Sequence, residues 1–113
     1  MTENTEILYL FGFSPRNGKH LENLYPIIKT QAENGSKIGI ILIHDGVIGA
    51  SSKGKITETM LKLLELPLFL YAVIADLKAR GISLDHIIEK IRLIEYSELV
   101  DLMDSTQKLI SWM

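Results

Sequence analysis

The segment Leu68–Gly81, LFLYAVIADLKARG, predicts the fold class most directly. Its first part, Leu68–Val73, is a short and nearly continuous apolar run, typical of a strand that is covered on both faces. From Ile74 the pattern becomes that of a short helix with a basic last turn and Gly81 as its stop. A strand that leads directly into a helix is half of a β-α-β unit, so we expect parallel strands.

Two similar apolar runs precede this segment. Ile7–Phe13 and Ile38–Ile43 are both predicted to be buried strands, and the first to be an inner strand. Between them, apolar residues recur at helical spacing up to Asn34–Gly35, which suits a helix closed by a left-handed cap residue.

Pro26 leaves two alternatives for the start of that helix. If the helix begins near Asn23, the proline lies in its first turn, where its missing N–H costs little. If the helix begins near Lys19, the proline lies in its interior and a kink is expected.

A second helix is predicted between the strands Ile38–Ile43 and Leu68–Val73. Thr57 can cap it, and Pro67 stops it. Its expected buried face consists of Met60, Leu61, Leu64 and, less clearly, Leu63.

The C-terminal third continues the alternation. Ile82–Lys90 suits one or two helical turns, and Ile91–Tyr96 a strand with one less covered face. Ser97 is predicted to cap a last helix, whose apolar residues are Leu99, Val100 and Met103. Lys108–Trp112 is predicted to be an edge strand.

This alternation predicts an α/β fold. We expect a single three-layer sandwich, with a mainly parallel sheet of about five strands and helices on both faces. A chain of 113 residues is large enough for one packed core and too short for two, so residues 1–113 are expected to form a single domain.

Composition excludes several classes of function. The net charge of −2, with no basic stripe, disfavours direct nucleic-acid binding. The absence of cysteine excludes disulfides, Cys-ligated zinc, iron–sulfur clusters and a persulfide carried by this chain. The polar, acidic start and the lack of a long apolar run predict neither a signal peptide nor a membrane helix, so we expect a cytoplasmic protein.

Ligand-contacting residues in open parallel sheets gather at the carboxyl ends of the strands. After the first strand, Ser14, Arg16 and Lys19 lie in a turn that offers backbone N–H groups and two cations to an anion. The turn has neither a GxxxxGK[ST] nor a GxGxxG pattern, so an ordinary polar turn is the favoured interpretation and a phosphate or sulfur-oxyanion site the alternative.

The second strand ends at His44, Asp45 and Gly46. Neighbouring side chains of an extended segment point to opposite faces, so a His44–Asp45 acid–base pair requires a turn between the two residues. The simpler interpretation is that Asp45 forms an Asx-type turn or caps the next segment, while His44 contacts a ligand or a partner. Asp76 follows the third strand at the same predicted edge.

Enzyme and metal sites find little support in the sequence. The three histidines are scattered without an i, i+4 pair, so no metal site and no cofactor are predicted. A hydrolase lacks a GxSxG elbow, and a phosphorylated receiver domain lacks the acidic cluster that would hold a divalent ion after the first strand. Trp112 close to the C-terminus must pack somewhere, either within the chain or against another subunit.

Four segments, taken in order, resemble the DsrH/TusB family of the DsrE-like group of sulfur-relay proteins. The matching segments are Ser14–Pro15, Leu42–Ala50 with its DGV, Leu70–Gly81 with its DLKARG, and Ile94–Val100 followed by Trp112. The Leu70–Gly81 block is the most distinctive of them.

The resemblance implies a DsrE-like sandwich and a small cytoplasmic subunit of a hetero-oligomer. Its implied partners are DsrE/TusD-like and DsrF/TusC-like paralogues and, indirectly, a TusA-like sulfur donor. Sulfur would pass as a persulfide towards tRNA 2-thiouridine formation or dissimilatory sulfur oxidation. Because this chain has no cysteine, the resemblance implies a structural or accessory role rather than that of carrier.

The sequence therefore predicts an accessory subunit that is not catalytic alone. Its predicted ligand- or partner-proximal residues are Ser14, Arg16, Lys19, His44, Asp45, Gly46 and Asp76, and its interface candidates are Tyr71, Tyr96 and Trp112. The alternative is a stand-alone homo-oligomeric module that binds a small anionic ligand or nucleotide at the carboxyl edge of the sheet.

Overall fold

The structure is a computed structural model that describes residues 5–15 and 19–113. These residues form one five-stranded sheet in the order β4-β3-β2-β1-β5, and every strand pair is parallel. The strands are β1 (Ile7–Phe11), β2 (Ile38–Leu42), β3 (Phe69–Val73), β4 (Ile91–Ile94) and β5 (Lys108–Trp112). The predicted α/β class and parallel sheet are confirmed.

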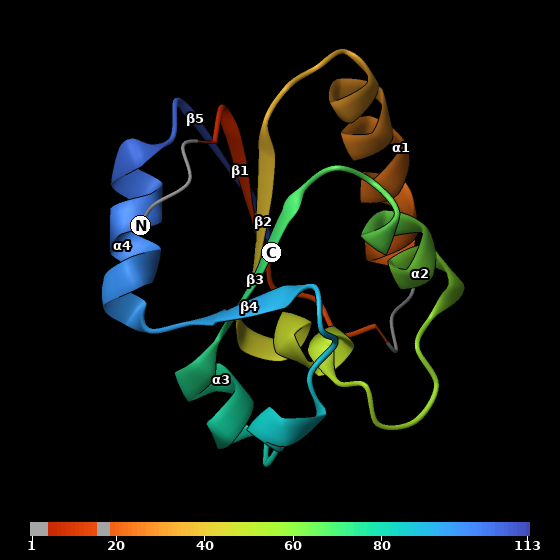
Figure 1. Cartoon of the computed structure of the whole chain (residues 1–113), viewed down its shortest axis with the longest axis vertical. Helices are drawn as coiled ribbons and strands as arrows, with labels where there is room; N and C mark the ends of the chain where they lie inside the picture. The colour runs from red at the N-terminus through yellow and green to blue at the C-terminus, as the bar shows by residue number, and fades with distance from the viewer. Residues whose placement is uncertain (1–4, 16–18) are drawn as a thin grey trace.

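Helices cover both faces of the sheet, as expected (Figure 1). They are α1 (Lys19–Glu33), α2 (Glu58–Leu64), α3 (Ile74–Ala79) and α4 (Tyr96–Ser105), with two 3₁₀ helices, η1 (His44–Ala50) and η2 (Leu84–His86). In Figure 1, α1 and α2 lie on one side of the sheet and α4 on the other, while η1 and α3 lie near the ends of β2 and β3.

Two hydrophobic clusters, one on each face, hold these layers together. On the first face, alternate residues of the strands pack against Leu24 and Ile28 of α1 and Leu63 of α2. On the second face, the other set of strand residues packs against Leu99 and Leu102 of α4. Because β1, β2 and β3 contribute to both clusters, they are nearly continuously apolar, as parallel strands buried on both faces are.

The first helix resolves the alternative at Pro26. Helix α1 begins at Lys19 and contains Pro26 in its interior, so the later start near Asn23 is wrong. It ends before Gly35, whose φ of +86° is the left-handed conformation predicted for the cap.

Two helix predictions need correction in detail. Thr57 caps α2 as expected, because its hydroxyl accepts a hydrogen bond from Met60 N. Met60 is buried as predicted, but Leu61 is 50% exposed and Leu63 is fully buried. The predicted cap at Ser97 is wrong, since α4 begins one residue earlier and Glu95 forms a capping box with Glu98. In the same helix, Leu99 is buried as expected, but Val100 is 54% exposed and Leu102 packs inward.

Candidate functional site

A polar network joins the carboxyl ends of three neighbouring strands. His44 follows β2, Asp76 lies in the first turn of α3 directly after β3, and Tyr96 opens α4 after β4. The parallel order β4-β3-β2 brings all three ends to the same edge of the sheet. Sequence reasoning predicted this edge, and the structure joins these three residues there.

Asp76 is the centre of the network and is 8% exposed. Its Oδ2 accepts a hydrogen bond from the backbone N–H of His44 at 2.8 Å, and its Oδ1 accepts one from the Tyr96 hydroxyl at 3.2 Å. A buried carboxylate is costly without such donors, so these bonds explain how the charge is tolerated. Asp76 therefore connects the segments that follow β2, β3 and β4.

Arg80 extends the network by one helical turn. Its Nη1 lies 3.9 Å from Asp76 Oδ1 and donates to the backbone carbonyl of Asp76 at 3.2 Å. Its Nε donates to Asp45 Oδ1 at 2.9 Å, so one guanidinium links both carboxylates. Sequence reasoning missed Arg80 as a site residue, although its i, i+4 spacing from Asp76 is the spacing of helical ion pairs.

The backbone turns sharply at His44. This residue has φ of +49°, a left-handed conformation that is unfavourable for residues other than glycine. The bond from His44 N to Asp76 holds that turn. His44 and Asp45 are both exposed, and Asp45 pairs with Arg80 across the loop. Asp45 therefore forms neither the Asx-type turn nor the cap that was predicted for it, and its carboxylate pairs with Arg80 instead.

Gly46 is required because η1 passes close to β1. Its N–H donates to Ile43 O at 2.8 Å, and a Cβ at this position would collide with the carbonyl oxygen of Phe11. Its role is close packing, because a side chain does not fit between η1 and the backbone of β1.

The remaining predicted site residues are not joined to Asp76 by any contact described. Arg16 lies outside the described residues, and Lys19 is the exposed first residue of α1. Ser14 is half-buried in the loop after β1 and has interactions of its own.

The three interface candidates differ in exposure. Tyr71 is 2% exposed and belongs to the core beneath α4, so it is not at the surface of a single copy. Tyr96 is 48% exposed, and Trp112 is partly buried on the outermost strand β5.

Tyr96 is also electrostatically linked to the network. Partial burial, the negative charge of Asp76 and the hydrogen bond to Asp76 all raise the pKa of the Tyr96 hydroxyl, and Arg80 opposes them. The proton of this hydroxyl is the one donated to Asp76 Oδ1. The arrangement presents an imidazole and a phenol to the outside, while the carboxylate and the guanidinium hold them in position.

The described residues contain no group of three or more His, Cys, Asp or Glu side chains that could hold a metal ion. Within the same part of the chain, none of the helices has both the length and the hydrophobicity needed to cross a lipid bilayer.

Comparisons with known proteins point to one family. Residues 14–109 match the model of a family described as DsrH-like protein. A curated protein, TusB from Serratia proteamaculans, is 34% identical over 73 residues, which are 65% of this chain and 73% of that protein.

Solved structures share the fold. The YchN protein from E. coli superposes with a TM-score of 0.75 at 14% identity, covering 95% of this chain and 98% of that one. MTH1491 from Methanobacterium thermoautotrophicum, a protein of unknown function, gives 0.69 at 12% identity, covering 90% and 96%. The fold is thus the DsrE-like one that the sequence resemblance implied.

Proposed function

This chain belongs to the DsrH family, and from that premise we propose that it is an accessory subunit of a sulfur-relay complex. The family match over residues 14–109 is the observation that carries the proposal. Residues 1–113 act as one DsrE/DsrH-like domain in the cytoplasm, and the complex serves tRNA 2-thiouridine formation or dissimilatory sulfur oxidation.

The chain does not carry the sulfur itself in this proposal. A persulfide forms on a thiolate, and the chain has no cysteine. A DsrE/TusD-like subunit therefore carries the reactive cysteine, a DsrF/TusC-like subunit completes the assembly, and a TusA-like protein supplies the sulfur.

We assign the polar network at the strand ends, formed by His44, Asp45, Asp76, Arg80 and Tyr96 and called here the strand-end network, to the surface that faces that cysteine. His44 and Tyr96 are exposed there, and Asp76 and Arg80 hold the backbone from which they project. Polar donors and cations near a thiolate lower its pKa and so favour the nucleophilic form. Lys19 and Arg16, which follow β1, are further cations proposed to act on a neighbouring chain.

Reconstitution tests the assignment. The chain is co-expressed with DsrE-like and DsrF-like paralogues encoded in the same genome, and the products are examined by native mass spectrometry. We expect a heteromer that contains all three chains. A chain that remains free of every DsrE-like paralogue, while those paralogues assemble with each other, would contradict the proposal.

A second measurement addresses the site. In the reconstituted complex, we expect His44→Ala to slow persulfide transfer from the donor without changing the stoichiometry. His86→Ala is the matched control, because His86 is also exposed but lies in η2 and has no hydrogen bond or ion pair with the residues of the network among those described. Equal transfer rates for the two variants would remove His44 from the proposed site.

A further inference from the structure

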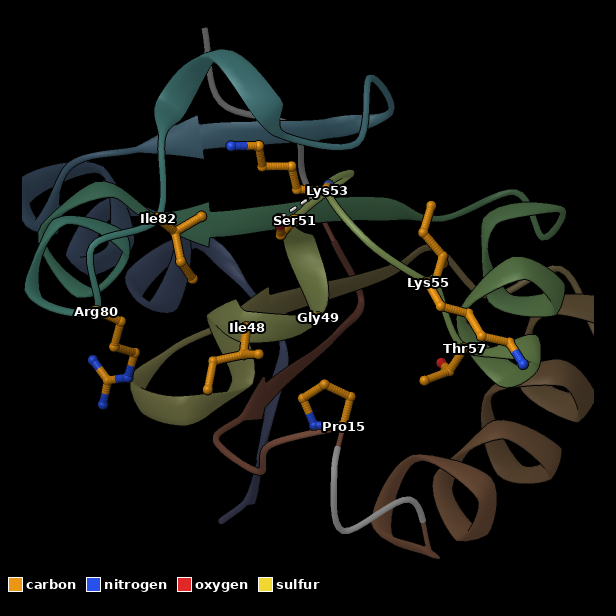
Figure 2. A pocket seen from close by; sticks show the side chains of 10 residues that line it. Pro15, Ile48, Gly49, Ser51, Lys53, Lys55, Thr57, Arg80 and Ile82 are labelled. Atoms are coloured by element: carbon orange, nitrogen blue, oxygen red, sulfur yellow. Dashed lines mark hydrogen bonds between the residues drawn. The ribbon is translucent and has the colours of Figure 1, made fainter.

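A hollow of about 460 Å³ beside η1 is lined by three cations, but they do not converge (Figure 2). The side chains of Lys53 and Lys55 point away from each other, and Arg80 is paired with Asp45. The described lining therefore presents no cluster of charges to a ligand. The apolar surface that the fold leaves uncovered lies on another element, β5.

Strand β5 is apolar in sequence but poorly covered. Its large apolar residues are Leu109, Ile110 and Trp112. Among the five strands described, β5 is nonetheless the one that contains no buried residue, and Leu109 is 41% exposed. Because the sheet order places β5 outermost, next to β1, one of its edges is open in a single copy of the chain.

The backbone of β5 bonds to β1 through alternate residues. At the start of the strand, the N–H of Lys108 donates to Glu6 O at 2.9 Å. At its end, the C=O of Trp112 accepts from Gly12 N at 3.2 Å. Successive residues of a strand direct their N–H and C=O groups to opposite sides, so Ile110, midway between them, also faces β1.

The N–H and C=O groups of Leu109 and Ser111 therefore point away from β1. In the described part of the chain, no strand lies beyond β5 to receive them. An outermost strand with free backbone groups is a template for pairing with a further strand. The sequence of β5 contains no proline, and its one charged residue, Lys108, is at the first position, so the middle of the strand is open to such pairing.

A second copy of β5 is complementary to this edge. Two antiparallel copies related by a two-fold axis at Ile110 overlap along the whole strand. Leu109 then lies opposite Ser111 of the second copy, and each such pair exchanges two N–H···O bonds through the outward groups.

The side chains match in the same register. Ile110 and Trp112 pack against the cluster beneath α1 and α2, and Lys108 lies on the same face of the strand. In the paired strands, Lys108 is opposite Trp112 of the second copy, in a non-hydrogen-bonded pair, where side chains are closest. A lysine ammonium is attracted to the face of an indole ring, and Lys108 has no ion pair among the described residues. Sliding one copy by two residues in either direction removes both of these lysine–tryptophan pairs.

We propose that the chain forms a two-fold homodimer in which the two copies of β5 pair antiparallel and continue the sheet from one chain into the other. The interface is isologous, so every contact occurs twice. It covers the apolar side chains that β5 leaves exposed in one copy. The inference goes beyond the proposed relay function, because this interface requires no paralogue.

Sedimentation equilibrium of the purified full chain tests the proposal. A single pair of strands is a small interface, so we expect a dimer with a dissociation constant in the micromolar range. Ser111→Pro removes an outward N–H and leaves the bonds to β1 in place, so it should weaken the dimer at least tenfold. Ser111→Ala is the matched control, because it keeps the N–H and should dimerise as the wild type does.

A second pair of variants tests the side-chain register. Lys108→Glu replaces the cation opposite Trp112 and should weaken the dimer by about fivefold or more. Lys29→Glu makes the same change of charge at an exposed position of α1 and should not. Thermal melts establish that each variant is folded, and if Ser111→Pro is not, the two lysine variants decide.

Three outcomes would overturn the proposal. They are a wild-type chain that stays monomeric at millimolar concentration, a dimer that folded Ser111→Pro leaves intact, and equal dimerisation of the two lysine variants. Heteromer formation with the paralogues is scored separately by native mass spectrometry, so a failure here is distinct from a failure of the relay proposal.

Discussion

Asp76 stabilises the strand-end network through both of its carboxylate oxygens. Replacement by alanine leaves His44 N and the Tyr96 hydroxyl without their acceptor. Hydrogen bonds to charged groups contribute about 1.5–3 kcal/mol each to stability, and a left-handed His44 depends on one of them. We expect Asp76→Ala to lower the free energy of unfolding by about 2 kcal/mol, measured by urea denaturation.

The matched control for this change is Asp101→Ala, which removes an exposed carboxylate from the middle of α4. That variant should unfold within about 0.5 kcal/mol of the wild type, as surface substitutions do. Equal stability of the two variants would mean that the Asp76 contacts do not stabilise the fold.

The raised pKa of Tyr96 predicts that the stability of the fold falls at alkaline pH. Because the pKa of Tyr96 is raised in the folded state, the folded chain holds this proton more tightly than the unfolded chain does. Its contribution to stability is complete below the unfolded pKa of about 10 and is lost as the pH rises through the folded value. We expect the wild type to lose stability more steeply than Tyr96→Phe above pH ~10 in urea denaturation.

The comparison of these two proteins isolates Tyr96. Burial also raises the pKa of Tyr9 and lowers that of Lys90, but both groups are present in both proteins and their contributions cancel. Parallel stability profiles from pH ~9 to ~11 would contradict the coupling to Asp76.

Sequence reasoning located His44 and Asp76 because parallel strands end at one edge, and that requires only the order of strands and helices. It could not join them, because the contact depends on a left-handed turn at His44 that no residue type there demands. Arg80 was missed for a similar reason, since its partner Asp45 is 35 residues distant in the sequence.

At the scale of elements, η1 packs directly against the backbone of β1. Gly46 and Gly49 lie one turn apart in it, but a Cβ on Gly46 meets the Phe11 backbone, whereas one on Gly49 meets the flexible end of Met60 at 3.4 Å. We expect Gly46→Ala to lower the free energy of unfolding by about 3 kcal/mol, and Gly49→Ala by less than ~1 kcal/mol, in thermal and urea unfolding. Similar losses for both would indicate that η1 can move away from β1.

Pro26 makes helix α1 less stable than a helix of the same length without an internal proline. The proline is exposed in the helix interior, where it removes a backbone hydrogen bond and costs about 3 kcal/mol relative to alanine. Pro26→Ala also gives the unfolded chain more freedom, which offsets about 1 kcal/mol of the gain. We expect a net gain of about 2 kcal/mol in the free energy of unfolding, and a loss of stability would show that the helix is shaped around the proline.

Helix boundaries were predicted less well than helix positions. Ser97 has the residue type of a cap, but Glu95 can form a capping box with Glu98, and the reciprocal pair prevails. The cap lies two residues before the predicted one, and the residues that pack against the sheet are Leu99 and Leu102, whereas Val100 is outside. The pattern of apolar residues alone does not show which of Val100 and Leu102 faces the sheet.

At the scale of the whole molecule, the sheet is covered unequally. Helices α1 and α2 cover one face, and α4 covers the other from a single position (Figure 1). The apolar runs predicted burial on both faces of the inner strands, and the two core clusters confirm it. They could not predict which helix surface another subunit would cover, because that depends on residues outside this chain.

The relay proposal makes α4 the helix that a partner reaches. Tyr96 belongs to the strand-end network, and Val100, one helical turn further on, is 54% exposed on the same side. A partner that contacts His44 and Tyr96 would therefore also cover Val100. An unpaired carboxylate placed there would be desolvated in the complex and would remain in water in the free chain.

We expect Val100→Asp to weaken the heteromer with the DsrE-like and DsrF-like paralogues at least tenfold, which corresponds to about 1.4 kcal/mol of binding free energy. Leu61→Asp is the control, because Leu61 is 50% exposed on α2, across the sheet from α4. Dissociation constants from analytical ultracentrifugation, with thermal melts of each free variant, separate lost binding from lost folding. A heteromer weakened by Leu61→Asp and left intact by Val100→Asp would move the interface to the α1–α2 layer, and the exposed Tyr96 would then face solvent in the assembly.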